Sequence, residues 1–262
     1  MTSINAGGAF YRVQNSINQN SENVSKSMQR LASGKQNIAP GDRTASSAVA
    51  FGVKGELASL KVGIQNATEV LQAVEMANND LSMLNEMVVR LEELNALGGN
   101  AFNSTEDVAA ITAEATAVLA EIALAQSNSQ WKGTDIFGTS TTVKFGKSGG
   151  SLAVTLTTVA ANGVTGAAVA AGTDATNIAA LKTAVDAQMV AAGTLYNKAA
   201  NTITHLGSLN AGYALDVASK MDVDFAGETT ELAKGQILAQ AGTAMLAQAN
   251  AQGQGMLALI QS

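Results

Sequence analysis

A stripe of apolar residues, spaced alternately four and three positions apart, runs through residues 53–81 of this chain. Its members are Val53, Leu57, Leu60, Ile64, Ala67, Leu71, Val74, Asn78 and Leu81, continued by Leu84, Val88 and Leu91. This spacing places the stripe on one side of a long helix, with Asn78 as a polar member. A helix with so narrow an apolar face needs other helices to cover it. The stripe therefore predicts a bundle or coiled coil that ends at Gly98-Gly99-Asn100.

The N-terminal segment carries a similar narrow stripe before the single proline, Pro40. Its members are Phe10, Val13, Ile17, Val24, Met28 and Leu31. Asn20 and Ser21 interrupt it, and polar residues in such a stripe usually fix the register of pairing. We expect a helix of roughly thirty residues, or ~45 Å, that is marginally stable without a partner.

The C-terminal segment predicts a second long terminal helix, because acidic residues fill its first turns and no proline follows. Its apolar stripe is rich in small and flexible side chains: Leu238, Ala241, Met245, Ala249, Met256 and Leu259. Such a stripe buries too little area to offset the entropy of ordering the helix. We therefore expect the two terminal helices to pair with each other and with copies in neighbouring subunits, and to become ordered on assembly.

The middle of the chain predicts one more helix and a small β element. Ser104, followed three residues on by Asp107, resembles a capping box and predicts a helix that reaches about Ser127. Residues 131–172 are rich in Thr, Val and Gly, and alternation of apolar and polar residues around the turn at 146–150 predicts a β-hairpin.

Helical composition resumes near Thr176 and continues to the C-terminal end, with weaker helical character around residues 206–212. The predicted fold class is therefore mainly α, with long antiparallel helices in coiled-coil or bundle domains and a small β-hairpin in the middle of the chain.

Composition argues against several classes of partner. The formal net charge is −6 and no basic stripe exists, so we expect no nucleic acid. The absence of cysteine rules out disulfides and thiolate metal sites. No apolar run approaches the ~20 residues of a membrane helix, so we expect no membrane partner. The N-terminal segment also lacks the pattern of a cleaved signal peptide.

We find no constellation of residues that predicts catalysis. The single histidine, His205, has no cysteine or carboxylate pair beside it, so we interpret it as a helix-surface residue. Asp222, Asp224 and Glu228 lack the glycine spacing of an EF-hand loop and suit the start of a helix better. We expect no enzymatic activity, no metal and no cofactor.

Both ends of the chain resemble the bacterial flagellins, the subunits of the flagellar filament. The N-terminal match includes Arg30, Leu31, Ser33 and Gly34, followed by Asp42 where the family usually has an acidic pair. The C-terminal match is the stronger one and includes Asp224, Phe225, Glu228, Leu232, Gln236, Ile237, Leu238, Gln240, Ala241, Gly242, Leu246, Gln248, Ala249 and Asn250. Together the two matches cover roughly residues 1–137 and 180–262.

The resemblance implies a structural subunit that polymerises into the extracellular filament used for swimming, exported without a cleaved signal peptide. The polymerising residues would be those of the terminal helices: Phe10, Val13, Ile17, Val24, Leu31, Leu232, Ile237, Leu238, Ala241, Met245, Leu246, Met256 and Leu259. Its partners would be copies of itself, an export chaperone at the C-terminal helix, and the hook-associated junction and cap proteins. The alternative is the hook–filament junction protein, which resembles flagellin at both ends.

The resemblance also implies a division into a terminal rod (D0), a bundle (D1) and a short outer region. The expected segments are 1–40 (D0 helix and spoke), 41–137 (first part of D1), 138–175 (variable region with the hairpin), 176–221 (second part of D1) and 222–262 (D0 helix).

Two further sites follow from the resemblance. Arg90, Leu94 and Glu114 match the patch that the animal Toll-like receptor for flagellin recognises, although Glu92 and Val89 depart from the activating pattern; a surface pair of Glu86 with Arg90 is the simpler interpretation. Exposed hydroxyls of the variable region are the expected glycosylation sites: Thr139, Ser140, Thr141, Thr142, Ser148 and Thr165.

Overall fold

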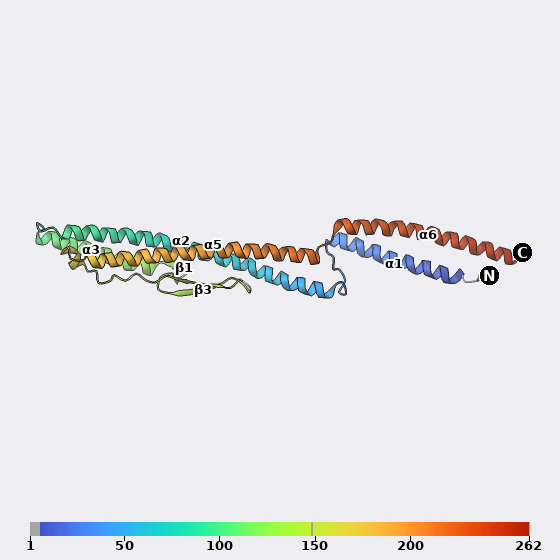
Figure 1. Ribbon diagram of the computed structural model, residues 1–262, viewed down its shortest axis with the longest axis horizontal. Helices are drawn as coiled ribbons and strands as arrows, with labels where there is room; N and C mark the ends of the chain where they lie inside the picture. The colour runs from blue at the N-terminus through green and yellow to red at the C-terminus, as the bar shows by residue number, and fades with distance from the viewer. Residues whose placement is uncertain (1–5, 148, 262) are drawn as a thin grey trace. The chain divides into compact units, whose positions relative to one another are not determined.

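The computed structural model describes residues 6–147 and 149–261, with side chains described for 10–147, 149–252, 254 and 255. As predicted, the described chain is mainly helical (Figure 1). Its helices are α1 (Ala6–Ser33), α2 (Thr44–Gly98), α3 (Thr105–Asn128), α4 (Gly166–Ala170), α5 (Ala175–Met221) and α6 (Phe225–Gln261). Its strands are β1 (Gln130–Trp131), β2 (Thr134–Asp135), β3 (Ser140–Lys144) and β4 (Ser151–Thr155).

The chain folds as two compact units. Unit 1 contains residues 1–54 and 213–262, and unit 2 contains residues 55–212. Helices α2 and α5 each contribute to both units, so the units do not end where helices end. The hairpin and α4 belong to unit 2.

The core of unit 2 joins α2, α3, α5 and the segment around the hairpin. On α2 the stripe is confirmed at Leu60, Ala67, Val74 and Leu81 and from Leu84 onward. Between these positions the buried residues are smaller than expected: Gly63, Val70 and Ala77 take the places given to Ile64, Leu71 and Asn78. Asn78 itself is exposed. The stripe is therefore turned slightly from the one that hydrophobicity selects, because small residues allow closer packing.

Helix α3 begins as predicted. The Ser104 side chain accepts from the backbone N–H of Asp107, and the Asp107 carboxylate accepts from the backbone N–H of Ser104 at 2.9 Å. Two backbone donors at the helix start are thus satisfied reciprocally.

The same helix corrects one expectation. With 24 residues and a mean hydropathy of 1.7 in its most apolar window, α3 is long and apolar enough to span a membrane by length and composition. Its many alanines raise the hydropathy without forming an obvious run of large apolar residues. In this fold Ile111, Ala115 and Ile122 are buried in the core of unit 2.

The predicted β-hairpin is confirmed as β3 and β4, which pair antiparallel with Thr141 opposite Val154 and Val143 opposite Leu152. The short pair β1–β2 and helix α4 were not predicted, because strands of two residues and a helix of five residues, little more than one turn, are too short for their periods to be recognised. Helix α5 also runs without a break through residues 206–212, where weaker helical character was expected, and Leu206 is fully buried there.

Burial along α2 predicts where truncation destabilises unit 2. We expect Leu84→Ala to lower the free energy of unfolding by about 2–5 kcal/mol, because Leu84 is fully buried and leaves a cavity. Leu97→Ala, on the same helix but 52% exposed, should cost less than about 1 kcal/mol. Urea unfolding of the monomer followed by circular dichroism compares the two; equal losses would contradict this core.

The capping box predicts a pH dependence. Hydrogen bonds from the backbone N–H and then the hydroxyl of Ser104 lower the pKa of Asp107 below its ordinary value of 3.8. The contribution of Asp107 to the free energy of unfolding is therefore complete at pH values above its ordinary pKa of 3.8. It is lost as the pH falls through the lower pKa that Asp107 has in the folded state. Urea midpoints of the wild type and Asp107→Ala should differ at neutral pH and converge in strong acid. A difference that persists in acid would contradict the ionic cap.

Candidate assembly surfaces

Unit 1 is built on the antiparallel pair of α1 and α6, which lie side by side (Figure 1). On α1 the inward residues are half-buried or buried: Val13, Ile17, Asn20, Val24, Ser27 and Leu31. On α6 the inward residues are Glu228, Leu232, Gly235, Ala239, Gly242 and Leu246. Both sets follow the alternating four-and-three spacing, which is the geometry of a two-helix coiled coil.

Two glycines let the helices approach closely. A Cβ placed on Gly242 would lie 2.8 Å from Cγ1 of Ile17, and one on Gly235 would lie 2.5 Å from Cγ2 of Val24. Both distances are shorter than carbon atoms tolerate, so the α1 side chains occupy the space that a side chain on α6 would need. The glycines are one heptad apart, and this spacing was the sequence signal that our search for apolar residues missed.

Asn20 crosses between the two helices, as a polar member of the stripe is expected to do. Its side-chain amide donates to the backbone carbonyl of Gly235 at 2.6 Å. That carbonyl is reachable because Gly235 has no side chain. A shift of the pairing by one turn would break this bond, so it fixes the register.

Most of the described part of the predicted C-terminal stripe is turned away from α1, whereas Leu238 lies at the edge of the seam and lines grooves with Ile17 and Asn20. Ile237, Leu238 and Met245 are 66%, 51% and 65% exposed, and Ala241 is also exposed. The seam with α1 is therefore formed mainly by a different set of α6 residues from the predicted stripe, with Leu238 at its edge. On α1, Met28 is likewise 51% exposed, and Ser27 takes the inward place. Phe10 is 37% exposed, and the side chains of Met256 and Leu259 lie outside the described residues.

The chain segment that follows α1 and the segment that precedes α6 are hydrogen-bonded to each other. The backbone N–H of Gln36 donates to the carbonyl of Met221 at 2.8 Å, and that of Val223 donates to the carbonyl of Gly34 at 3.1 Å. Gly34 has a positive φ of 67°, which ends α1 and turns the chain.

An ionic cluster joins residues near these backbone hydrogen bonds. Arg30 is 3.5 Å from the carboxylate of Glu228 and 4.0 Å from that of Asp42. Hydrogen bonds from the backbone N–H groups of Ala39 and Ile38, with the charge of Arg30, lower the pKa of Asp42. The cluster therefore joins residues of α1, α6 and the connecting segment.

In unit 2, two residues of the expected receptor patch, Arg90 and Glu114, are paired at the surface, whereas the third, Leu94, is buried. Arg90 donates to Glu114 at 2.6 Å and to Glu93 at 2.8 Å, and these two carboxylates raise its pKa, Glu93 most. The expected pair with Glu86 is therefore replaced. Leu94 is 1% exposed and lies in the core, so it is not presented at the surface.

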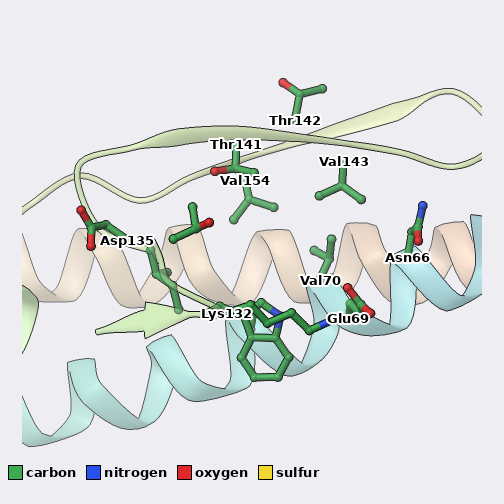
Figure 2. A pocket seen from close by; sticks show the side chains of 13 residues that line it. Asn66, Glu69, Val70, Lys132, Asp135, Thr141, Thr142, Val143 and Val154 are labelled. Carbon is green, nitrogen blue, oxygen red and sulfur yellow. Dashed lines mark hydrogen bonds and ion pairs between the residues drawn. The ribbon is translucent and has the colours of Figure 1, made fainter. Parts of the chain in front are cut away.

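The expected glycosylation sites have different surroundings. Thr139 donates to the carbonyl of Asp135, and Thr165 caps α4 by accepting from the N–H of Ala168. Thr141 and Thr142 both line a cavity under the hairpin, and the Thr142 side chain points away from α2 (Figure 2). Ser140 is exposed and shares a hydrogen bond with Thr155, and Ser148 lies outside the described residues.

Within the described part of the chain, no group of three His, Asp or Glu side chains is arranged to hold a metal ion. His205 lies exposed on α5, as interpreted from the sequence. The surfaces that distinguish this molecule are apolar stripes and helix seams.

Comparison with known proteins agrees with this architecture. A flagellin from Halalkalibacterium halodurans is 28% identical over 248 residues, covering 90% of this chain and 91% of the relative. Flagellin FlaB2 of Treponema pallidum is 25% identical, covering 95% and 96%. A flagellar filament 33 kDa core protein of Treponema phagedenis is 27% identical, again covering 95% and 96%.

Two family models match the chain. The bacterial flagellin N-terminal helical region matches residues 4–142, and the bacterial flagellin C-terminal helical region matches residues 175–260. The unmatched segment between them holds most of the hairpin and α4. With both helical regions present in order and relatives aligned over nearly the whole chain, this protein belongs to the bacterial flagellin family.

Proposed function

We propose that the outward stripes of α1 and α6 are the main polymerising surfaces of this flagellin. As a flagellin, the chain is a structural subunit of the flagellar filament, which serves motility. The observation that carries the proposal is the exposure of large apolar residues on both α1 and α6. Tyr11, Met28, Ile237, Leu238 and Met245 are each more than half exposed. Their burial requires other chains.

The two sets of terminal residues would have different roles. Val13, Ile17, Val24, Leu31, Leu232 and Leu246 lie half-buried in the seam, so they would hold α1 and α6 together. Ile237, Ala241 and Met245 are exposed and would contact neighbouring subunits, together with the exposed part of Leu238 at the edge of the seam. Each such contact is small, but an array multiplies it. The hook–filament junction protein is not favoured, because the family models and relatives are those of flagellins.

The proposal extends to the subunit before assembly. Until neighbours cover it, the outward stripe of α6 would need another cover, which an export chaperone would provide. Hook-associated junction and cap proteins would meet the same helices at the filament ends. We further propose export without a cleaved signal peptide to the extracellular filament, and no enzymatic activity.

Polymerisation of purified protein tests the proposal. Salted-out wild type should form long uniform filaments in negative stain, because the stripes of many copies are buried together. Gly242→Leu should raise the critical concentration about tenfold or more, since the new side chain separates α1 from α6.

Gly193→Leu is the control and should polymerise like the wild type, because this exposed glycine lies on α5 in unit 2 and a Cβ there meets no other atom within 4 Å. Short caps or no filaments from the wild type would contradict the proposed function. Equal assembly of Gly242→Leu and the wild type would contradict the role given to the α1–α6 seam.

Recognition by the animal receptor for flagellin is a second proposal, limited to Arg90 and Glu114. Both side chains are about half exposed and hold each other in place, whereas Leu94 would act only through the core. Purified monomer should activate a receptor reporter cell, and Arg90→Ala should reduce the signal several-fold, because it removes the charged contact. Lys182→Ala, which also removes a cation paired with a glutamate, is the control. No response to the wild type would reject this role.

A further inference from the structure

The turn between α2 and α3 presents a large apolar side chain to solvent. Phe102 is 95% exposed, the highest value among the exposed large hydrophobic residues of the described chain. The turn is held by hydrogen bonds: the N–H of Phe102 donates to Oδ1 of Asn100 at 3.1 Å, and the Asn103 side chain donates to the carbonyl of Leu97 at 2.9 Å. An aromatic side chain on such an ordered turn loses little entropy when it is buried in a partner.

The same unit contains a cavity of about 380 Å³ between α2 and the hairpin. Figure 2 shows Val143 and Val154 pointing from the hairpin toward α2, above Val70. The strands are fastened to α2 on one side of the cavity, where Asn66 donates to the carbonyl of Lys144 at 2.9 Å. The cavity is therefore framed by fixed elements and lined largely by apolar atoms.

One polar atom near the cavity lacks a partner. The indole Nε1 of Trp131, which lines the cavity, is buried and makes no hydrogen bond with any described residue. A buried N–H of this kind costs free energy unless an acceptor reaches it. An occupant with an apolar group and a carbonyl oxygen would satisfy both requirements of the cavity.

We propose that Phe102 of one subunit inserts into this cavity of a second copy. Phe102 cannot reach its own cavity, because Ala73 and Gly98 are 25 residues apart on α2, or roughly 38 Å. The aromatic ring supplies the apolar group, and the backbone carbonyls of the turn supply the acceptor. The inference deepens the proposed function, on which it rests, by naming a contact between unit 2 of successive subunits.

A second copy is the expected occupant, because a flagellin packs against copies of itself in the filament. Residues 99–107 carry two acids, Glu106 and Asp107, and no basic residue. Residues 130–156 carry three lysines, Lys132, Lys144 and Lys147, and one aspartate. Within the cavity lining Lys132 is 2.7 Å from Glu69, which offsets its charge, and Asp135 adds a second acid. The attraction to Glu106 of the turn therefore comes from Lys144 and Lys147 of the hairpin.

The size of the contact also agrees with a polymer. A phenylalanine buries ~150–250 Å², far below the ~800 Å² per partner of a stable dimer. The contact would not join two free monomers, but it would add to the terminal helices in an array. Because turn and cavity are different surfaces of one subunit, the contact is head-to-tail, the kind of contact from which a helical filament can be built.

Two substitutions test the contact from its two sides. Phe102→Ala removes the inserted ring, and Thr141→Phe fills the cavity from the hairpin; each should raise the critical concentration about tenfold or more. Thr155→Phe places the same ring on the hairpin outside the cavity lining and should polymerise like the wild type. Circular dichroism of the monomers checks that all variants fold.

Cross-linking identifies the contact directly, because the chain has no cysteine. Phe102→Cys and Thr141→Cys subunits, polymerised together and treated with a short bismaleimide, should give cross-linked dimers. Phe102→Cys with Thr155→Cys should give few, and Phe102→Cys alone none. Wild-type filaments combined with unchanged assembly of Phe102→Ala, or with no dimers from the first mixture, overturn this inference alone. Failure of the wild type to form filaments rejects the proposed function itself.

Discussion

Close approach between helices with narrow seams is the constraint on which this flagellin depends. Where α1 meets α6, the contact positions of α6 include Gly235 and Gly242, and α1 side chains fill the space above them. On α2 in unit 2, Ala67 and Ala77 are fully buried, and Gly63 lets the backbone of Phe145, after strand β3, come close. Small residues give up buried area per position, but they let backbones come close, and the gain is spread over long helices. No single position dominates the fold.

Much of this architecture could be predicted from the sequence. Long helices leave a periodic signal, so the long helices themselves could be predicted. The end of α2 at Gly98 and the start of α3 after Ser104 could be predicted too. The hairpin was clear because alternation around a glycine turn is specific. Elements such as α4 and β1–β2 are too short for any periodic signal. They depend on tertiary partners, such as the bond from Thr165 to Asp174 at 3.0 Å, which joins residues that pattern alone does not connect.

The choice of helix face was harder to predict than the helices themselves. A search for apolar residues selects Leu238 and Met245, yet the inward face of α6 follows Gly235 and Gly242. Hydrophobicity ranks residues by the apolar area that their side chains can bury, whereas a close helix–helix seam depends on positions that have no side chain, such as Gly235 and Gly242. The same reason explains Met28 and Ser27 on α1. Leu94 shows the converse error, since a match to a surface patch said nothing about its burial.

The backbone hydrogen bonds between the segment after α1 and the segment before α6 have a consequence for how the two terminal helices pair. Ser33 and Phe225 are far apart in the sequence, so bringing α1 to α6 closes a long loop at an entropic cost. The bonds of Gln36 with Met221 and of Val223 with Gly34 meet that cost at one end of the pair. Once these hydrogen bonds have formed, α1 and α6 are at high effective concentration for each other. Each further helical turn then adds contacts without closing a new loop. Pairing of α1 with α6 is therefore expected to proceed from these hydrogen bonds toward the chain ends, so that the hydrogen-bonded segments are where folding of the pair begins.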